Sequence, residues 1–404
     1  MTTPAIVPQT GAHSSVPVPG PASEVTHGSQ APTWAHGVEA MNRLAVLLEE
    51  SGEHNHALLW YQRAAATGDP TANYNLGLFY REHGPLDQAV KHLTVAAEAG
   101  DTDAAYALGT LGLQHGNKAV AQRWLTVAAE HNDIAALNCL GALELAEGDT
   151  ETAQQRFRQA AEAGAPEAAY NLSRLVRHHG GSSEEINHWL RAAALGGDPD
   201  AAYELGMSAR KNGDFAEAEA RLRSAADAGH PLAAHQLARL CCERGDDETG
   251  ERWYRKAAAA GRIEAMNNLG VLLERRGRDE DATKWYEAAI NAGHTGAVYN
   301  LGVLLEKRED PNRAADYYEQ AAEAGNPAAA YNLGVLLRDH GDIGGAEEWF
   351  RRAAVAGDSD AAFNLGVLLA ERHEDVEAER WFRVAAEAGD EEAIAHLAVI
   401  LERR

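Results

Sequence analysis

One leucine recurs through the chain at a nearly constant interval, and this register constrains the fold more than any other feature. Every interval has the same length except the one from Leu172 to Leu205, which is one residue longer. The twelve positions of this marker leucine are Leu44, Leu76, Leu108, Leu140, Leu172, Leu205, Leu237, Leu269, Leu301, Leu333, Leu365 and Leu397. Such a period indicates small supersecondary units, each of which buries its apolar face only against its neighbours.

Each repeat has the pattern of two short helices. In residues 329–358, Leu333, Leu336 and Leu337 share one helical stripe, and Gly341 follows it, where glycine supplies the left-handed backbone that ends a helix. A second stripe then runs to Gly357. The pattern predicts an all-α fold, an α-α superhelix in which antiparallel helix pairs stack into a right-handed solenoid. The predicted loop glycines include Gly52, Gly84, Gly116, Gly148, Gly213, Gly245 and Gly277.

Further residues recur at fixed places within the repeat. Aspartate before the first helix predicts an N-cap at Asp69, Asp101, Asp198, Asp358 and Asp390. Proline at the first helical position is expected at Pro70, Pro166, Pro199, Pro231 and Pro327. A glycine after the marker leucine, such as Gly270, is expected to let the two helices approach closely, with an alanine such as Ala282 facing it.

The predicted organisation has two parts. Residues 1–33, rich in Pro, Ser and Thr, are expected to form a disordered N-terminal tail. Residues 34–404 are expected to form the solenoid, with about eleven helix pairs and a C-terminal capping helix. In that last helix, Ile394, Leu397, Ile400 and Leu401 are predicted to cover the preceding repeat.

The formal net charge of −25 disfavours a nucleic-acid partner, because phosphate would be repelled. No apolar run is long enough for membrane insertion, and the start of the chain lacks the basic and apolar regions of a signal peptide, so a cytoplasmic location is expected. The composition, rich in Ala, Gly, Asp and Arg, is typical of GC-rich bacterial coding sequences. The three cysteines are predicted to be buried and unpaired.

No phosphate-binding loop, nucleophile elbow or zinc-protease motif occurs in the sequence. We therefore expect no catalytic residue, no metal site and no cofactor. Histidines at the place just before the loop glycine (His83, His115, His179 and His340) are replaced by arginine in other repeats, for example by Arg244 and Arg276. That exchange favours an interaction with the helix C-terminus over metal binding.

Glycine, alanine and aromatic residues recur at fixed distances from the marker leucine. In one repeat, Leu333 is followed by Gly334, Gly341, Ala346, Phe350 and Ala353. This spacing resembles the tetratricopeptide repeat, and the endings W-[YF]-x-x-A-A-x-A-G-[DN] resemble the Sel1-like repeat. The resemblance covers about residues 37–404, but the Asp-Pro turn of the first family and the G-x-G-V insertion of the second are missing. It implies a protein-binding scaffold whose first helices line a concave groove.

Asparagine stands just before the marker leucine in half of the repeats and would point into that groove. Its amide suits the backbone of an extended peptide, but it could equally bond to the neighbouring helix and stiffen the stack. These candidate partner-binding residues are Asn75, Asn171, Asn268, Asn300, Asn332 and Asn364. From the eighth to the eleventh repeat they alternate with valines, which makes these repeats a second candidate surface.

Repeats five to seven carry basic groups at groove positions of an acidic chain. One interpretation is that they hold an acidic segment or a C-terminal carboxylate of a partner through bidentate contacts. The other is that they are solvated helix ends paired with nearby carboxylates. The candidate residues are Arg174, Arg177, Arg210, Lys211 and Arg239.

The sequence therefore predicts a non-catalytic interaction scaffold or adaptor that binds a peptide or segment of a partner protein in the concave groove. The alternative is a regulatory or assembly subunit that grips a folded partner, such as an enzyme. The partner's identity and the oligomeric state do not follow from the sequence.

Overall fold

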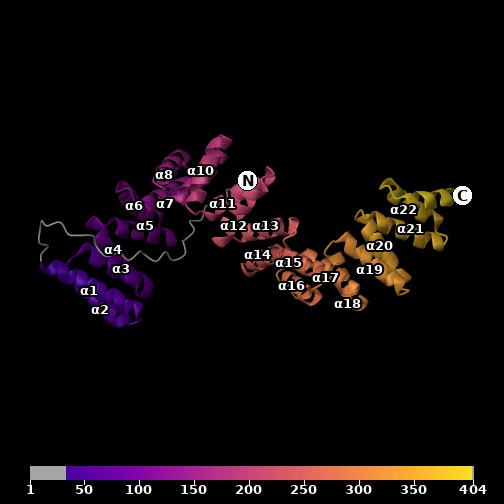
Figure 1. Ribbon diagram of the computed structural model, residues 1–404, viewed down its shortest axis with the longest axis horizontal. Coiled ribbons are helices and arrows are strands. Elements are labelled where there is room, and N and C mark those ends of the chain that lie inside the picture. The colour runs from indigo at the N-terminus through magenta and orange to yellow at the C-terminus, as the bar shows by residue number, and fades with distance from the viewer. Residues whose placement is uncertain (1–32, 403–404) are drawn as a thin grey trace. The chain divides into compact units, whose positions relative to one another are not determined.

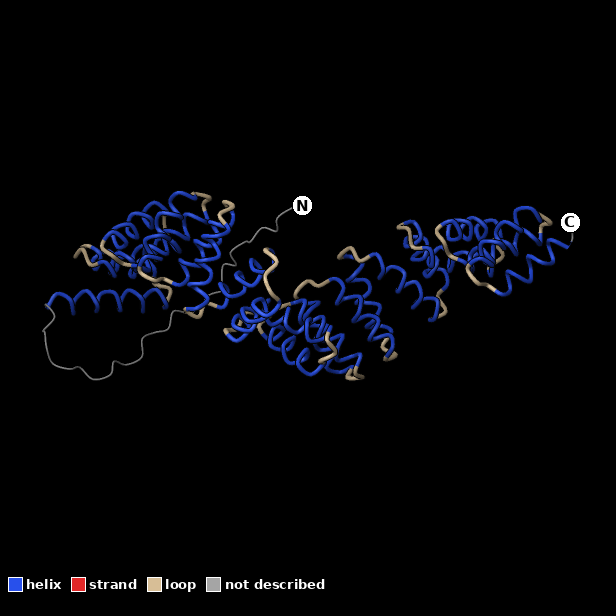
Figure 2. The backbone as a smooth tube through the Cα atoms, turned by 90° about the horizontal axis from the view of Figure 1, so that it is seen from above, coloured by secondary structure: helices blue, strands red, loops and turns tan. Residues whose placement is uncertain are grey.

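The computed structural model describes residues 33–402, with side chains from residue 37 onward, and these residues form 23 helices and no strand. Figure 2 shows the helices joined by short connections. The predicted all-α class of stacked helix pairs is confirmed. The predicted N-terminal tail lies outside the described residues, except for Thr33, which begins the first helix.

The chain divides into two compact units, Met1–Leu205 and Gly206–Arg404. The first unit contains α1 (Thr33–Glu50), α2 (His54–Ala65), α3 (Pro70–His83), α4 (Leu86–Glu98), α5 (Thr102–Gln114), α6 (Lys118–Glu130), α7 (Ile134–Ala146), α8 (Thr150–Glu162), α9 (Pro166–His178) and α10 (Ser183–Leu195). The unit boundary falls inside α11 (Pro199–Lys211). The second unit continues with α12 (Phe215–Asp227), α13 (Pro231–Glu243), α14 (Asp247–Ala259), α15 (Ile263–Arg275), α16 (Asp279–Asn291), α17 (Thr295–Lys307), α18 (Pro311–Glu323), α19 (Pro327–Asp339), α20 (Ile343–Val355), α21 (Ser359–Glu371), α22 (Asp375–Glu387) and α23 (Glu391–Glu402).

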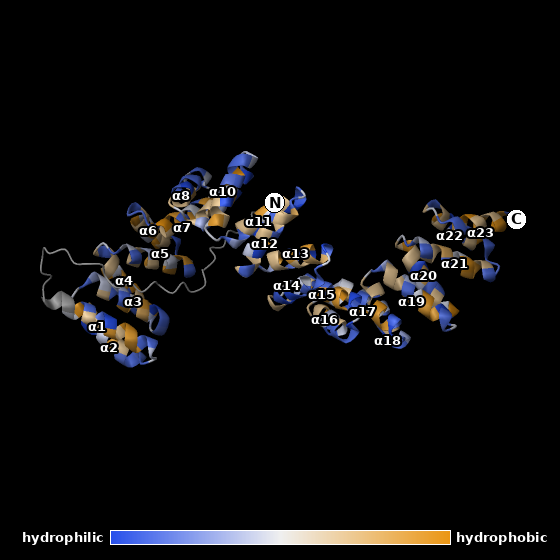
Figure 3. Ribbon diagram, in the orientation of Figure 1, coloured by the Kyte–Doolittle hydropathy of each residue, from blue (hydrophilic) through white to orange (hydrophobic). Residues whose placement is uncertain are grey.

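Odd-numbered helices carry the marker leucine and are the first helices of their repeats; even-numbered helices are the second. Within each unit, a first helix packs against its own second helix, which packs against the next first helix, as α3, α4 and α5 do (Figure 1). Second helices such as α14 and α18 carry more hydrophilic residues, coloured blue, than first helices such as α13 and α15 (Figure 3). The largest buried side chains nevertheless come from the second helices, as Tyr286, Tyr318 and Phe350 do, and they are fully buried.

The glycine after the marker leucine allows a close helix contact, as predicted, but its neighbour was predicted wrongly. A Cβ atom at Gly270 would lie 2.6 Å from Cε1 of Tyr286, and one at Gly366 would lie 2.8 Å from the ring of Phe382. The facing residue is thus the aromatic or leucine side chain one helical turn beyond the predicted alanine. Ala282 is fully buried all the same.

Most loop glycines adopt the predicted left-handed backbone, for example Gly341 at φ 84°. Gly84 is an exception and was predicted wrongly: its φ is −140° and its ψ is −169°. Pro85 follows directly, and a residue before proline is sterically driven to the extended region. In two repeats a residue with a side chain occupies the left-handed place, namely Glu309 at φ 59° and His373 at φ 62°.

The predicted caps are confirmed. Asp69, Asp101, Asp198, Asp358 and Asp390 each accept a hydrogen bond from the backbone N–H three residues later. Proline opens each of the five helices for which it was predicted: α3, α9, α11, α13 and α19. The three cysteines are free, with Cys241 buried and the other two half-buried.

The final helix α23 covers the preceding repeat with fewer side chains than predicted. Ile400 is buried and Leu397 is half-buried, but Ile394 is 52% exposed and Leu401 is 45% exposed. The residues equivalent to these two in the preceding repeat, Ala362 and Leu369, are fully buried. No second helix follows α23 within residues 33–402, so both side chains face outward. Across those residues, none of the helices combines the length and apolar character needed to cross a membrane.

Candidate functional site

The asparagines before the marker leucine link neighbouring first helices. In the second unit, Asn300 Nδ2 donates to Asn267 Oδ1 at 2.9 Å, and Asn268 Nδ2 lies 2.9 Å from His235 Nε2. In the first unit, Asn171 Nδ2 donates to Asn138 Oδ1 at 3.0 Å. In each contact, the asparagine directly before a marker leucine reaches a residue of the previous repeat. That residue lies two places before the marker leucine of its own repeat. These hydrogen bonds between side chains stiffen the stack. The asparagines involved lie on the same face of successive first helices.

The remaining asparagines are held differently. Asn332 Nδ2 lies 3.5 Å from the hydroxyl of Tyr299. Asn364 donates to the Asp360 carbonyl at 2.8 Å and accepts from Arg338 Nη1 at 2.8 Å. Asn75 is half-buried on α3. The bonds within the stack occupy only part of each amide's capacity of two donors and two acceptor lone pairs.

A row of valines accompanies the asparagines in the second unit. Each valine follows its asparagine by three positions, which places the two side chains one helical turn apart on the same face. Val271 is 45% exposed, and the three others are half-buried. We call this surface the first-helix face; it consists of Asn268, Val271, Asn300, Val303, Asn332, Val335, Asn364 and Val367.

The aromatic residues that precede the asparagines pack mainly inside their own repeat. The ring centroid of Tyr299 lies 6.0 Å from that of Tyr318, and Tyr331 and Phe350 are 5.9 Å apart. The partner ring in each case belongs to the second helix of the same pair. These half-buried rings therefore hold the first helix against the second helix of its own pair.

In the first unit, two of the predicted basic residues contact other side chains of the chain. Arg177 Nη2 pairs with Glu204 Oε2 at 2.6 Å, and Tyr170 donates to the other oxygen of Glu204 at 3.0 Å. The guanidinium of Arg174 lies over the Tyr170 ring at 5.8 Å. Arg177 and Tyr170 thus share one carboxylate on α11, and Arg174 contacts the Tyr170 ring.

The other three predicted basic residues belong to the second unit. Arg210 pairs with Glu243 at 2.6 Å and donates to Gln236 at 3.0 Å, and Arg239 lies 3.7 Å from the same Glu243. Lys211 is exposed at the end of α11. Arg210 and Arg239 therefore share one carboxylate, as the interpretation of paired helix ends anticipates.

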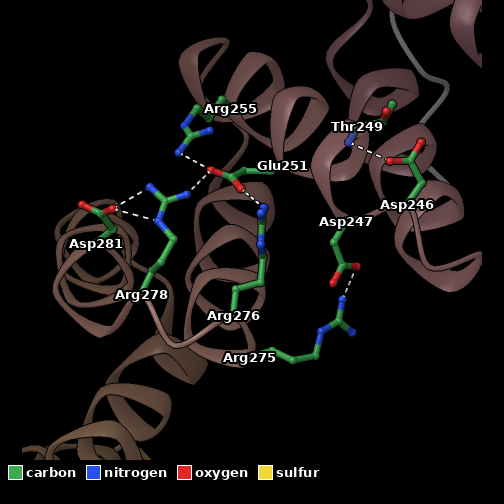
Figure 4. A network of polar contacts seen from close by, with 9 residues as sticks. All are labelled: Asp246, Asp247, Thr249, Glu251, Arg255, Arg275, Arg276, Arg278 and Asp281. Atoms are coloured by element: carbon green, nitrogen blue, oxygen red, sulfur yellow. Dashed lines mark hydrogen bonds and ion pairs between the residues drawn. The ribbon is translucent and has the colours of Figure 1, made fainter.

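A cluster of charges between repeats seven and eight was missed from the sequence. Glu251 on α14 is 7% exposed in its side chain, and three guanidinium groups converge on it (Figure 4). Arg255 lies 2.5 Å and Arg278 2.7 Å from Glu251 Oε1, and Arg276 pairs with Oε2. Burial opposes the charge of Glu251, but hydrogen bonds from Arg255 and Arg278 outweigh it and lower its pKa.

The same arrangement recurs at other contacts between repeats. Glu219 pairs with Arg223 and Arg244, and Glu347 pairs with Arg351 and Arg372. The glutamate occupies the same place on each of these second helices, and the arginine of the next repeat stands just before the left-handed turn residue. The contacts between repeats could have been predicted from this recurrence of a glutamate and an arginine at two fixed repeat positions. Arginine at this position therefore joins two repeats, in addition to its predicted interaction with the C-terminus of its own helix.

Comparisons with known proteins agree with the repeat pattern. Tetratricopeptide repeat models match residues 203–262, 262–292 and 299–361. The Sel1 repeat model matches residues 38–69, 70–101, 102–133 and 359–390. Together these matches cover more than half of the chain. No sequence among the curated proteins matches it.

Solved structures of other repeat proteins are similar to the chain. A protective antigen present in uropathogenic Escherichia coli strains, which displays an SLR fold, is 24% identical with a TM-score of 0.65, over 92% of this chain and 89% of that one. A Sel1 repeat protein from Oxalobacter formigenes is 25% identical with a TM-score of 0.45, over 67% of this chain and 88% of that one. The first similarity shows the shared fold. The chain belongs to the tetratricopeptide and Sel1-like repeat family, whose fold generally serves as a scaffold for protein–protein interactions.

Proposed function

We propose that this protein is a non-catalytic scaffold or adaptor that binds an extended segment of a partner protein in the concave groove of its first helices. The observation that carries the proposal is the first-helix face, where amides and small apolar side chains alternate over four consecutive repeats. A cytoplasmic location, expected from the sequence, is part of the same proposal.

The chemistry of the face supports an extended segment as the ligand. An extended chain leaves its backbone N–H and C=O groups unpaired, and asparagine can serve both. Val271, Val303, Val335 and Val367 offer apolar contact of small volume, which suits small side chains between the backbone contacts. A rigid row of donors also lowers the entropy lost on binding, because the amides of Asn268 and Asn300 are already held in place.

The basic residues extend the proposal toward acidic partners. A carboxylate of the partner would take the place of Glu204 at Arg177, or of Glu243 at Arg210, because both guanidinium groups already hold a carboxylate. We propose each of these two places, the one in the first unit and the one in the second, as a further contact. If the double variant Arg174→Glu, Arg210→Glu keeps the full affinity of the native chain for its partner, neither place takes part in binding.

The test starts from affinity capture with the full chain, followed by a peptide array of the captured partner. A short peptide from the array is expected to bind and to compete with the whole partner. Val271→Asp with Val303→Asp is expected to weaken that peptide at least about tenfold, since two carboxylates enter an apolar contact. Val355→Asp is the control, because Val355 is 74% exposed on the second helix α20.

The alternative is a regulatory or assembly subunit that grips a folded partner. In that case no short peptide competes, and the Val355→Asp control weakens the partner as much as the double variant does. Either result would contradict binding in the groove and favour the regulatory or assembly subunit.

A further inference from the structure

Three side chains with metal-ligand chemistry meet where repeats one and two touch. One donor atom from each of Glu49, Glu82 and His83 lies within 4.8 Å of the other two. His83 Nε2 is 3.2 Å from Glu49 Oε1 and 3.9 Å from Glu82 Oε2. Zinc binds histidine nitrogen and carboxylate oxygen at about 2.0–2.2 Å, so tetrahedral ligands sit about 3.3–3.6 Å apart. The two observed distances bracket that separation.

The ligand atoms are oriented by a second layer of contacts. Tyr61 donates from its hydroxyl to Glu49 Oε2 at 2.7 Å, which leaves Oε1 directed at His83. The rings of His54 and His83 are in tilted contact, with centroids 4.3 Å apart and planes 33° apart, and the ring of Phe79 lies 5.0 Å from His83. Bonded carboxylates and fixed imidazole rings of this kind hold ligands in metal sites.

The charge balance at this contact differs from that of the later repeats. There, the residue before the loop is an arginine that pairs with a glutamate of the previous repeat, as Arg276 does with Glu251. Here the same place is taken by His83, which is charged only when protonated. Arg81, which is always charged, lies 3.7 Å from Glu82. This single positive charge leaves the two carboxylates of Glu49 and Glu82 with a net negative charge.

Repeats nine and ten contain a natural comparison. There, His340 occupies the repeat position of His83. Glu306 and Asp339 stand at the positions of Glu49 and Glu82. The hydroxyl of Tyr318 donates to Glu306 at 2.6 Å, as that of Tyr61 does to Glu49. Pro311 replaces His54, however, and the Nδ1 atom of His340 lies 2.7 Å from the Leu336 carbonyl. These groups do not come together as the first three do. The His54 ring against His83 and the longer Glu82 side chain are therefore the features that go with the gathered arrangement.

We propose that Glu49, Glu82 and His83 bind a divalent transition-metal ion of the zinc class, with His54 supporting the ring of His83 and water completing the coordination. The nitrogen and oxygen donors suit Zn²⁺, and four-coordinate Co²⁺ can replace it as a probe. The site was not predicted from the sequence because its ligands come from two helices, α1 and α3. Only the stacking of repeats brings together side chains that are more than one full repeat apart in the chain.

The experiment is calorimetric titration of the full, tag-free chain with Zn²⁺ after treatment with a chelator. Excess Mg²⁺ is included to occupy the many exposed carboxylates. One ion per chain is expected to bind, and Co²⁺ is expected to give the visible absorption of a four-coordinate site. Tyr61→Phe is expected to weaken Zn²⁺ by about tenfold through the lost second-layer contact.

Two variants separate ligation from folding. His83→Arg restores the residue found at this place in other repeats, so the chain should keep its helical circular dichroism while the Zn²⁺ and Co²⁺ signals disappear. His115→Ala is the matched control, since His115 shares the repeat position but has Arg81 and Gln114 in place of the two glutamates. The proposal is overturned if the native chain shows no saturable binding of one ion. It is equally overturned if His83→Arg binds Zn²⁺ like the native chain, or if His115→Ala loses as much affinity.

Discussion

At the scale of the single residue, the connection within each helix pair, except that of α3 and α4, turns through one left-handed position. Glycine fills it in most repeats, but His373 holds φ 62° and Glu309 holds φ 59°. For a residue with a Cβ atom this conformation costs about 1–2 kcal/mol, because Cβ crowds the following carbonyl oxygen. Two of the connections therefore carry strain that the others avoid.

Replacing His373 with glycine is expected to stabilise the chain. The relief of strain exceeds the extra entropy that glycine loses on folding, which leaves a gain of about 0.5–1 kcal/mol in the free energy of unfolding. Urea unfolding followed by circular dichroism measures it. The matched change Gly341→Ala, at the same repeat position in the preceding repeat, is expected to cost about 1 kcal/mol. A His373→Gly variant less stable than the native chain would contradict this explanation of the turn.

Asp198 connects stability to pH. Its carboxyl caps α11 through the Ala201 N–H at 2.7 Å, but burial raises its pKa from 3.8 to about 6. Because the folded pKa is the higher one, the carboxyl contributes stability below about pH 4 that is lost as the pH rises through about 6.

The expected result is that the native chain loses about 2 kcal/mol relative to Asp198→Asn between pH 4 and pH 7. Asparagine keeps the cap and does not titrate, so the difference isolates the carboxyl. Thermal unfolding of both proteins at a series of pH values measures it. Parallel curves for the two proteins would mean that Asp198 titrates near its unfolded value.

The residue scale also shows how far sequence reasoning reaches. Caps such as Asp69 were predictable because they depend on a neighbour three positions away. Gly84 was predicted wrongly because the rule for glycine was applied without the effect of Pro85. Local geometry is thus readable from local sequence when every neighbour is considered.

At the scale of the helix, charged contacts hold neighbouring repeats together in the second unit. Glu251 on α14 reaches Arg276 and Arg278, which follow α15. The pairing was not predicted, although the glutamate and the arginine each recur at a fixed repeat position, because the register does not show that these two positions touch across neighbouring repeats. Helix positions follow from the register of the marker leucine, but side-chain partners do not.

Glu251→Ala is expected to lower the free energy of unfolding by about 1–3 kcal/mol. It leaves three neighbouring guanidinium groups without their shared carboxylate, although the exposure of the arginines moderates the loss. Glu280→Ala is the control, because Glu280 is 75% exposed and pairs only with Arg308, at 3.1 Å, among the described residues. It should change the free energy by less than about 0.5 kcal/mol. Equal losses in both variants, measured by urea unfolding, would show that the cluster adds nothing to an ordinary surface pair.

At the scale of the whole molecule, the register of the marker leucine was sufficient to predict the repeat fold. The unit boundary at Leu205 also falls on the leucine that ends the single longer interval. The first-helix face was predictable as a set of positions, because the repeat places Asn300 and Val303 alike in each copy. The bonds among those amides, and the carboxylates held by Arg177 and Arg210, depend on contacts between repeats that the register alone does not specify.

Site-specific photo-crosslinking decides whether a partner segment lies along the first-helix face. A photoreactive residue is placed at Val271, which is 45% exposed on α15, or at Lys284, which is 74% exposed on α16 of the same repeat. We expect the captured partner to crosslink from position 271 and not from position 284. Crosslinks from position 284 alone would contradict the proposed function and would place the partner on the second helices.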